Sequence, residues 1–141
     1  MIDKEIIKIA SNTENYGRID NYTHFSKLKN SICGDVMKIY LIVKNDKIAN
    51  FRYECESCIY CQASASVLSR KAKNISIEKV KSFVEHAKKC FEKNTNSFDK
   101  EWKEFDKIMT KNNISRKECL LLPLNTTLNA LNKKSSWTSK K

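Results

Sequence analysis

Apolar and polar residues alternate most clearly between residues 36 and 55. The first half, Val36–Val43, is rich in β-branched and aromatic residues, and a turn-forming Asn-Asp-Lys sequence follows at 45–47. In the second half, Phe51 and Tyr53 alternate with charged residues, as in a strand with one buried face. The pattern therefore predicts a β-hairpin over residues 36–55.

The rest of the chain has mostly helical spacing of apolar residues. Ser76 and Ser115 are placed to cap two of the helices, and Pro123 is expected to mark a kink in the last one. A further strand is expected within residues 22–28, and Asn112-Asn113 is expected to be a loop. The predicted helices span residues 1–11, 61–73, 76–93 and 115–131, and a further amphipathic segment covers 98–111.

These elements predict an α+β fold in which a small antiparallel three-stranded sheet, the hairpin 36–55 plus a preceding strand, packs against four to five helices. The chain has 141 residues, which is enough for one compact domain and too few for two. We expect a single domain over residues 1–134 and a basic tail without fixed structure over residues 135–141.

The composition narrows the functional classes. The longest apolar run, Cys119–Leu124, is far shorter than a membrane span, and residues 1–10 have no apolar signal region. We therefore expect a cytoplasmic protein without membrane association. The cytoplasm is a reducing compartment, so disulfides are not expected there. We therefore interpret the six cysteines first as metal ligands, catalytic groups or small buried residues.

The net charge of +11 invites a nucleic-acid hypothesis. Only four of the 27 basic residues are Arg, however, and the lysines are scattered along the chain. Arginine is the side chain that reads bases and phosphates with two hydrogen bonds at once. We therefore expect no nucleic-acid partner.

The first candidate motif for chemistry is Cys33-Gly34-Asp35. Gly34 is one of only two glycines, and it stands just before the hairpin. A glycine permits a sharp turn or a positive φ, which would aim its two neighbours at one point. The motif would then offer a thiolate and a carboxylate from one loop; an ordinary turn before a strand is the alternative.

Three cysteines at positions 55, 58 and 61 form the second motif. Cys55 is expected to end a strand and Cys61 to open a helix, which places Cys58 in the loop at the helix N-terminus. Free N–H groups there stabilise a thiolate. Cys58 is therefore the best ligand candidate of the three, although the spacing also resembles part of a ferredoxin cluster site without its Cys-Pro.

Two further cysteines lie on predicted helices. Cys119 falls near the start of the last helix, one turn after Arg116, and a positive charge and a helix N-terminus both favour a thiolate. A buried cysteine on an apolar helix is the alternative. Cys90 follows His86 by four residues, and we interpret it as a core cysteine beside a surface histidine.

If the loops converge, three thiols and one carboxylate meet at Cys33, Asp35, Cys58 and Cys119. Four such ligands suit tetrahedral zinc, and thiolates also suit iron–sulfur clusters. A carboxylate in place of a fourth thiolate weakens the hold on a soft metal. The set therefore favours a site that exchanges ligands over a permanent structural clamp.

Four sequence motifs, in order, resemble the IscU/SufU/NifU N-terminal scaffold group of iron–sulfur assembly. NTENYG at 12–17 resembles its NPxNxG, and NSICGD at 30–35 resembles its NPxCGD. RYECESC at 52–58, followed by ASAS at 63–66, resembles RFEGEGC followed by ASAS. RKECLLLPL at 116–124 resembles RxKCxxLPW. The long stretch between the second and third motif cysteines, and Glu118 where IscU has a histidine, make SufU the most similar branch.

The resemblance implies that Cys33, Asp35, Cys58 and Cys119 bind zinc. Cys33 would also accept persulfide sulfur from a cysteine desulfurase, which makes the chain a sulfurtransferase-like acceptor, and Arg116 matches an arginine near the site. Apo iron–sulfur proteins would receive the product. The alternatives are a scaffold that builds and transfers a transient [2Fe–2S] cluster, and a metal-stabilised binding module without transfer activity.

The chain departs from the group near its central motif. Cys55 and Ser57 stand where the group usually has glycines, and Cys61 stands where SufU often has serine. These departures leave open whether Cys55 or Cys61 competes as a ligand or as a sulfur relay.

Overall fold

The computed structural model describes the backbone of residues 4–31, 34–93 and 98–133. Three antiparallel strands, β1 (His24–Lys29), β2 (Val36–Lys44) and β3 (Lys47–Glu56), form one sheet in the order β1-β2-β3. The predicted hairpin is β2–β3, and the preceding strand pairs with β2 as expected.

The hairpin turn has the backbone that its residues favour. Asn45 and Asp46 both have positive φ, 52° and 62°, and Lys44 pairs with Lys47. Two left-handed residues between paired strands match the twist of the hairpin, and Asn and Asp tolerate that conformation well.

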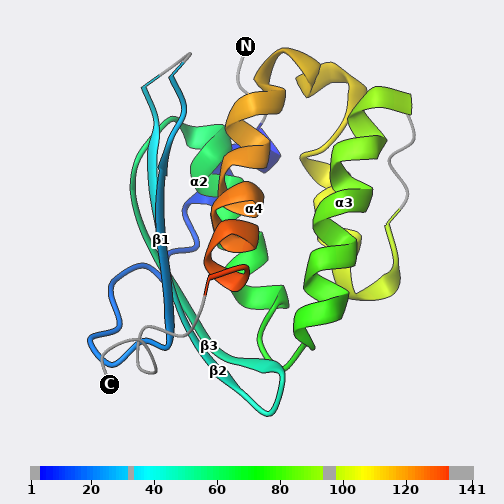
Figure 1. Cartoon of the computed structure of the whole chain (residues 1–141). Helices are drawn as coiled ribbons and strands as arrows, with labels where there is room; N and C mark the ends of the chain where they lie inside the picture. The colour runs from blue at the N-terminus through cyan, green and yellow to red at the C-terminus, as the bar shows by residue number, and fades with distance from the viewer. Residues whose placement is uncertain (1–3, 32–33, 94–97, 134–141) are drawn as a thin grey trace.

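Helices cover one face of the sheet in two layers (Figure 1). The inner layer is α2 (Ile59–Lys71) and α4 (Lys117–Leu131), which pack on each other and on the strands, while α1 (Lys4–Ala10) packs on α2. The outer layer holds α3 (Ile77–Lys93), which packs on α4. The core lies between these layers, and its largest fully buried side chains include Phe51, Tyr53, Phe105 and Leu68.

The predicted α+β architecture is therefore confirmed. Small residues on α2 (Ala63, Ser64, Ala65 and Ser66) are fully or almost fully buried, which lets the helix lie close to its neighbours. Ser76 caps α3 as predicted, because its Oγ accepts a hydrogen bond from the Lys79 N–H at 3.2 Å.

Two local predictions were wrong. Asn112-Asn113 is not a loop but part of a 3₁₀ helix, η2 (Lys111–Arg116), and it follows another 3₁₀ helix, η1 (Lys100–Lys107). The residue that precedes α4 is Arg116, so Ser115 does not cap it. Ser115 lies inside η2, which leads directly into α4, and this continuation removes the free helix end that a serine would cap.

The segment 12–17 closes the outer edge of the sheet. Gly17 donates a backbone hydrogen bond to the Tyr53 carbonyl, and the Tyr53 N–H donates to the Asn15 carbonyl. Gly17 has a φ of 136°, which an L-residue with a side chain rarely adopts. The NTENYG segment at 12–17 therefore protects the edge strand β3 next to Cys55.

Candidate metal centre

The loop before β2 is shaped by Gly34. Its φ is 76°, and its N–H donates to the Asn30 carbonyl at 2.7 Å, while the Asn30 N–H donates to the Asp35 carbonyl at 2.7 Å. A Cβ on this glycine would touch no atom within 4 Å, so the left-handed backbone is the reason for glycine here. Of the two conformations expected for Gly34, a sharp turn or a positive φ, the structure shows the positive φ.

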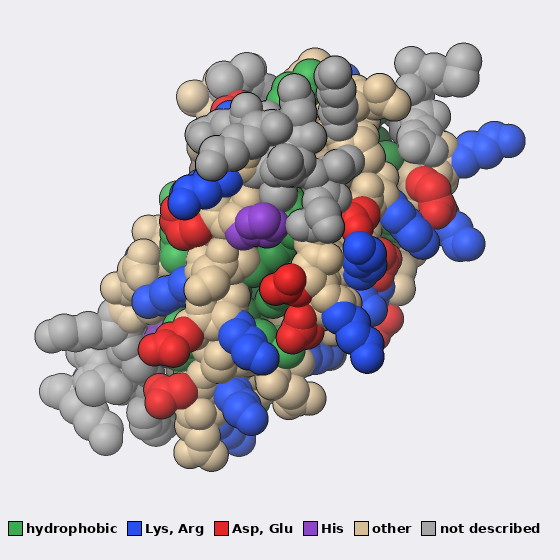
Figure 2. Space-filling view, turned by 90° about the vertical axis from the view of Figure 1, so that its right-hand side faces the viewer, with side chains coloured by type: hydrophobic (Ala, Val, Ile, Leu, Met, Phe, Trp, Pro, Cys, Tyr) green, Lys and Arg blue, Asp and Glu red, His purple; other side chains and the backbone are tan. Residues whose placement is uncertain are grey.

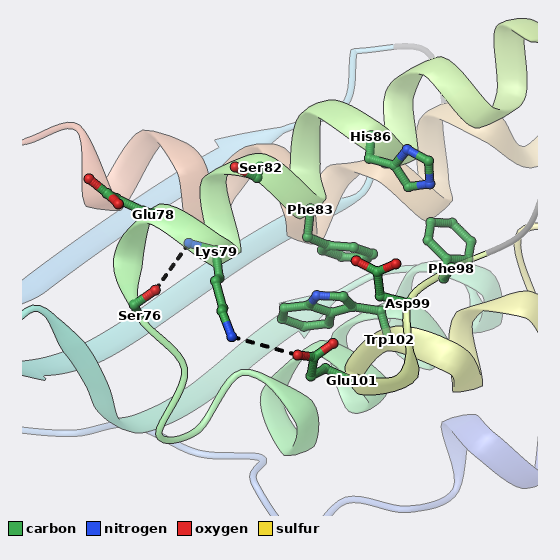
Figure 3. Close-up of a pocket in the computed structure, with 10 residues that line it drawn as sticks. All are labelled: Ser76, Glu78, Lys79, Ser82, Phe83, His86, Phe98, Asp99, Glu101 and Trp102. Carbon is green, nitrogen blue, oxygen red and sulfur yellow. Dashed lines mark hydrogen bonds and ion pairs between the residues drawn. The ribbon is translucent and has the colours of Figure 1, made fainter.

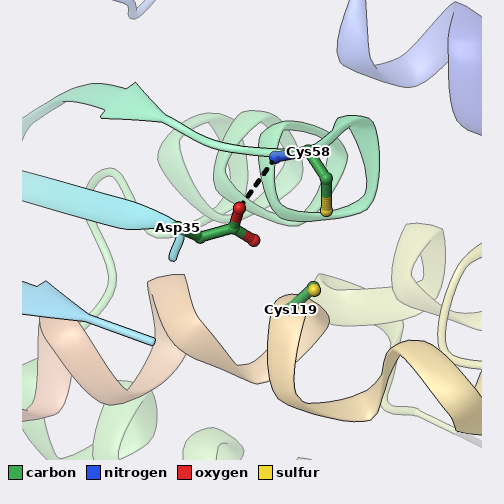
Figure 4. A group of neighbouring side chains, drawn as sticks. All are labelled: Asp35, Cys58 and Cys119. Carbon is green, nitrogen blue, oxygen red and sulfur yellow. Dashed lines mark hydrogen bonds between the residues drawn. The ribbon is translucent and has the colours of Figure 1, made fainter. Parts of the chain in front are cut away.

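Asp35 points at the start of α2. Its Oδ1 accepts a hydrogen bond from the Cys58 N–H at 3.1 Å (Figure 4). Cys58 is the N-cap residue of α2, and its own side chain makes no capping bond. A carboxylate from a different element thus occupies the positive end of the helix, where negative charge is stabilised.

Asp35, Cys58 and Cys119 meet at one point. One carboxylate oxygen and the two sulfur atoms all lie within 4.8 Å of one another. Asp35 comes from the loop before β2, Cys58 from the end of the loop after β3, and Cys119 from the first turn of α4 (Figure 4). Three segments far apart in the sequence therefore converge, as the motifs predicted for these three residues.

The buried acid has an oxygen without a partner. Asp35 is only 5% exposed, and among the described residues its Oδ2 has no hydrogen bond. A buried carboxylate oxygen left unpaired is costly unless a cation or donor satisfies it. Two thiols beside such an oxygen make a donor set that fits a thiophilic divalent cation such as zinc.

The fourth predicted ligand, Cys33, lies outside the described residues. Its role as ligand and as sulfur acceptor stays a prediction. Cys33 is two residues before Asp35 in the sequence, so the same short loop carries both.

Arg116, the other predicted catalytic residue, precedes α4 and is exposed. Its guanidinium carbon lies 5.2 Å from the centre of the Tyr60 ring, which is a cation–π contact. Tyr60 follows Cys58 by two residues, so this contact ties the start of α4 to the start of α2. Arg116 therefore joins the two helices that carry the thiols.

The extra cysteines lie near the centre without being part of the converging group. Cys55 is partly buried and Cys61 is fully buried, and both are free thiols. Burial is the main cause that raises the pKa of each thiol. The side chain of Cys90 lies outside the described part of the chain, so its interpretation as a core cysteine stays a prediction.

A larger hollow lies away from the metal centre, between α3 and η1. It has a volume of about 640 Å³, and Figure 2 shows hydrophobic side chains between charged ones on this face. Phe83 and Trp102 stack at its floor with ring centres 4.2 Å apart (Figure 3). Its acidic residues and His86 form no group of three close ligand atoms among the described residues. Sequence reasoning gave no sign of this hollow, because it arises where two distant aromatic segments pack.

A three-stranded sheet covered by helices, with an acid and two thiols where three segments converge, defines an α+β domain with a candidate metal centre. The NifU-like N terminal domain family matches residues 1–96, well over half of the sequence. The chain belongs to this family, and the family predicted from the sequence motifs is confirmed.

The chain is also similar to curated proteins named iron-sulfur cluster assembly scaffold protein IscU. The Thermotoga maritima protein is 29% identical over 89 residues, which cover 63% of each chain. Two Archaeoglobus fulgidus proteins are 28% identical over 78 residues, which cover 55% of this chain and 51% of theirs. The chain thus spans about half to two thirds of the length of these relatives.

Solved structures share the fold. The N-terminal part of a NifU-like protein from Brucella abortus superposes with a TM-score of 0.84 at 17% identity, covering 92% of this chain and 90% of that one. A putative SUF-system scaffold, FiSufU from Fervidobacterium islandicum, gives 0.82 at 24% identity, covering 93% and 96%. Within the described residues, no helix is both long and apolar enough to cross a membrane.

Proposed function

We propose that the chain is a SufU-like, zinc-dependent sulfur acceptor in iron–sulfur cluster assembly. The observation that carries the proposal is the convergence of Asp35, Cys58 and Cys119 within 4.8 Å. The similarity to proteins named as iron–sulfur assembly scaffolds supports the biological setting. In this proposal the protein acts in the cytoplasm, receives sulfur from a cysteine desulfurase and serves apo iron–sulfur proteins.

The proposed ligand set is Cys33, Asp35, Cys58 and Cys119. The Asp35 Oδ2, unpaired among the described residues, and the two sulfurs supply three donors in the proposal, and Cys33 supplies the fourth. Zinc bound there would keep the thiols deprotonated and shield them from side reactions. Asp35 also fixes the Cys58 backbone, since its other oxygen accepts the Cys58 N–H.

The proposed chemistry is a thiol–persulfide exchange at Cys33. The Cys33 thiolate attacks the outer sulfur of a persulfide on the desulfurase. A new S–S bond forms on Cys33 while the S–S bond of the donor breaks, and the donor cysteine leaves as a thiolate. In the proposal, the positive charge of Arg116 stabilises the negative charge of the exchanging sulfurs.

The test uses the full chain, a purified cysteine desulfurase and cysteine. Trapping the free thiols with an alkylating reagent and mapping them by mass spectrometry should find one added sulfur on Cys33. A Cys33→Ala variant should lose this product and its stimulation of desulfurase turnover. Unchanged turnover with Cys33→Ala would refute the acceptor role and favour a binding module without transfer activity.

A second candidate is a scaffold that builds and passes on a [2Fe–2S] cluster, here the cargo of the protein. The Thermotoga and Archaeoglobus relatives, which are named as scaffold proteins, favour it. Glu118 is exposed on α4, immediately before Cys119, where a histidine would offer a further ligand. A brown protein that transfers its cluster after reconstitution would support the scaffold, whereas stoichiometric colourless zinc supports the acceptor.

A further inference from the structure

Cys55 is a thiol that the proposed function does not use. It is the second-last residue of β3 and stands three residues before Cys58. Strand alternation puts its side chain on the same face as Phe51 and Tyr53, which are buried under the helices. Cys55 also packs against this core. It therefore lies on the side of the sheet that holds the candidate metal centre.

Cys55 is electrostatically coupled to that centre. Negative charge on Asp35 or on Cys58 raises the pKa of the Cys55 thiol, in addition to the larger effect of burial. The buried Ser57 hydroxyl, which has no conventional hydrogen bond among the described residues, interacts with the thiols of both Cys55 and Cys61. The Ser57 hydroxyl at the start of α2 thus lies between two thiols, those of Cys55 and Cys61.

Of the two extra thiols, only Cys55 has room to move. It borders a hollow of about 220 Å³ at the sheet edge, which Tyr16, Tyr53 and Gln62 also line. Cys61 is 0% exposed and lies inside α2. The Cys55 sulfur is not among the atoms that lie within 4.8 Å of one another, so ligation requires its side chain to turn toward the centre.

The centre needs a replacement donor during the proposed reaction. Tetrahedral zinc takes four ligands, and the described residues bring three together. In the proposed function the fourth, Cys33, is also the sulfur acceptor, so its ligand position opens when it reacts. A second thiol that fills this position would keep the metal bound while Cys33 accepts sulfur.

We propose that Cys55 is this replacement ligand: it binds the metal together with Asp35, Cys58 and Cys119 when Cys33 is engaged in sulfur transfer. On binding, the Cys55 thiol gives its proton to water, and no electrons are exchanged. This inference rests on the proposed function and adds an exchange of ligands within the chain itself.

The test compares wild type with Cys33→Ser, Cys55→Ser, Cys61→Ser and the double variant Cys33→Ser/Cys55→Ser. Zinc affinity is measured by competition with a chromophoric chelator. Cobalt(II) serves as a second probe, because its thiolate charge-transfer absorption counts the bound sulfurs. Circular dichroism checks that each variant is folded, and Cys61→Ser is the matched control at the same spacing from Cys58.

We expect Cys33→Ser to keep the wild-type cobalt absorption, since Cys55 restores the third thiolate. The double variant should bind zinc roughly 10–100-fold more weakly than Cys33→Ser. Losing a residue that only supports a metal ligand already costs this much affinity. If Cys33→Ser alone loses about one third of the absorption and the double variant is no weaker, Cys55 is not a ligand. A wild-type protein that binds no zinc would instead overturn the proposed function.

Discussion

Two acids near opposite ends of α2 are held in different ways. Near the N-terminus, Asp35 is buried, and among the described residues one of its oxygens has no partner. Near the C-terminus, Glu104 receives two hydrogen bonds from the Arg70 guanidinium, at 2.8 and 2.9 Å. Glu104 has partners for both oxygens and is therefore a structural acid. Asp35 has a partner for only one among the described residues, so it is a candidate ligand.

The same contrast extends along α2. The Ser64, Ser66 and Ser69 hydroxyls in its body each donate a hydrogen bond to a backbone carbonyl, at 2.7, 2.8 and 2.9 Å. At its start, Asp35 keeps a buried oxygen unpaired among the described residues, and the partners of the buried Ser57 hydroxyl are thiols. The polar groups in the body of α2 therefore stabilise the fold, whereas the acid and thiols at its start suit a bound metal ion.

The largest expected effect is the loss of zinc affinity when a thiol of the centre is replaced. Replacing Cys119 by serine removes one of the three converging donors, and we expect zinc affinity to fall by about 100-fold or more. Chelator competition measures the affinity, and Cys61→Ser is the control, since that thiol lies outside the converging group. Equal affinity in wild type and Cys119→Ser would remove Cys119 from the centre.

The next largest effect is a loss of stability when Glu104, the acid paired with Arg70, is replaced. Changing Glu104 to Gln weakens the double hydrogen bond with Arg70, whose side chain is 16% exposed, and should cost about 2 kcal/mol of unfolding free energy. Zinc affinity should stay at the wild-type value. Urea unfolding at pH 7 gives the free energy, and a loss of zinc binding in this variant would break the separation between the two acids.

The pH dependence of this ion pair has a defined sign. Hydrogen bonds from Arg70 are the main cause that lowers the pKa of Glu104 below its ordinary value of 4.5. A lowered carboxyl pKa contributes stability that is fully present above the unfolded value and is lost as the pH falls through the folded one. The difference between wild type and Glu104→Gln should therefore be constant near neutral pH and shrink below about pH 4.5. A difference that does not depend on pH would show that the charge of Glu104 contributes nothing.

Asp35→Asn should affect zinc binding more than stability, which is the opposite of the effect expected for Glu104→Gln. The asparagine can still accept the Cys58 N–H, but it removes the charge that faces the two thiols. Zinc affinity should fall roughly 10–100-fold, while the metal-free protein should lose only about 1 kcal/mol of unfolding free energy, from the lost charge at the helix N-terminus. Thermal unfolding with and without zinc measures both quantities. A large loss of stability without metal would make Asp35 a structural acid like Glu104.

The smallest effect is expected in the body of α2. Ser64→Ala removes the hydrogen bond to the Leu120 carbonyl, which links α2 to α4, at a cost of about 1 kcal/mol. The sulfur positions should not change, so zinc affinity should be unaffected. Urea unfolding together with chelator competition checks both, and a cost in zinc affinity alone would contradict this assignment.

The sequence predicted the sheet well because its signal is local. Alternation over residues 36–55 and the Asn45-Asp46 turn determine a hairpin without help from distant residues. The 3₁₀ helix η1 was not predicted as such: its Trp102 and Phe105 pack against Phe83 of α3, a tertiary contact that the local pattern does not contain.

The candidate centre was predicted in its residue types and only partly in its geometry. Cysteines at the starts of two helices and an acid after a glycine could be read from the motifs. The hydrogen bond between Asp35 and the Cys58 N–H could not, because it joins residues 23 positions apart and depends on how β2 and β3 pair. The position of Cys55 beside open space likewise depends on the packing of Tyr16 at the sheet edge.

X-ray absorption at the zinc edge of the purified wild-type protein tests the central claim most directly. We expect about one zinc per chain, with a dominant sulfur shell near 2.3 Å and one oxygen near 2.0 Å. The sulfur shell should shrink in Cys58→Ser and in Cys119→Ser. A zinc surrounded by nitrogen and oxygen alone, or a sulfur shell that neither variant changes, would contradict a metal centre built from Asp35, Cys58 and Cys119.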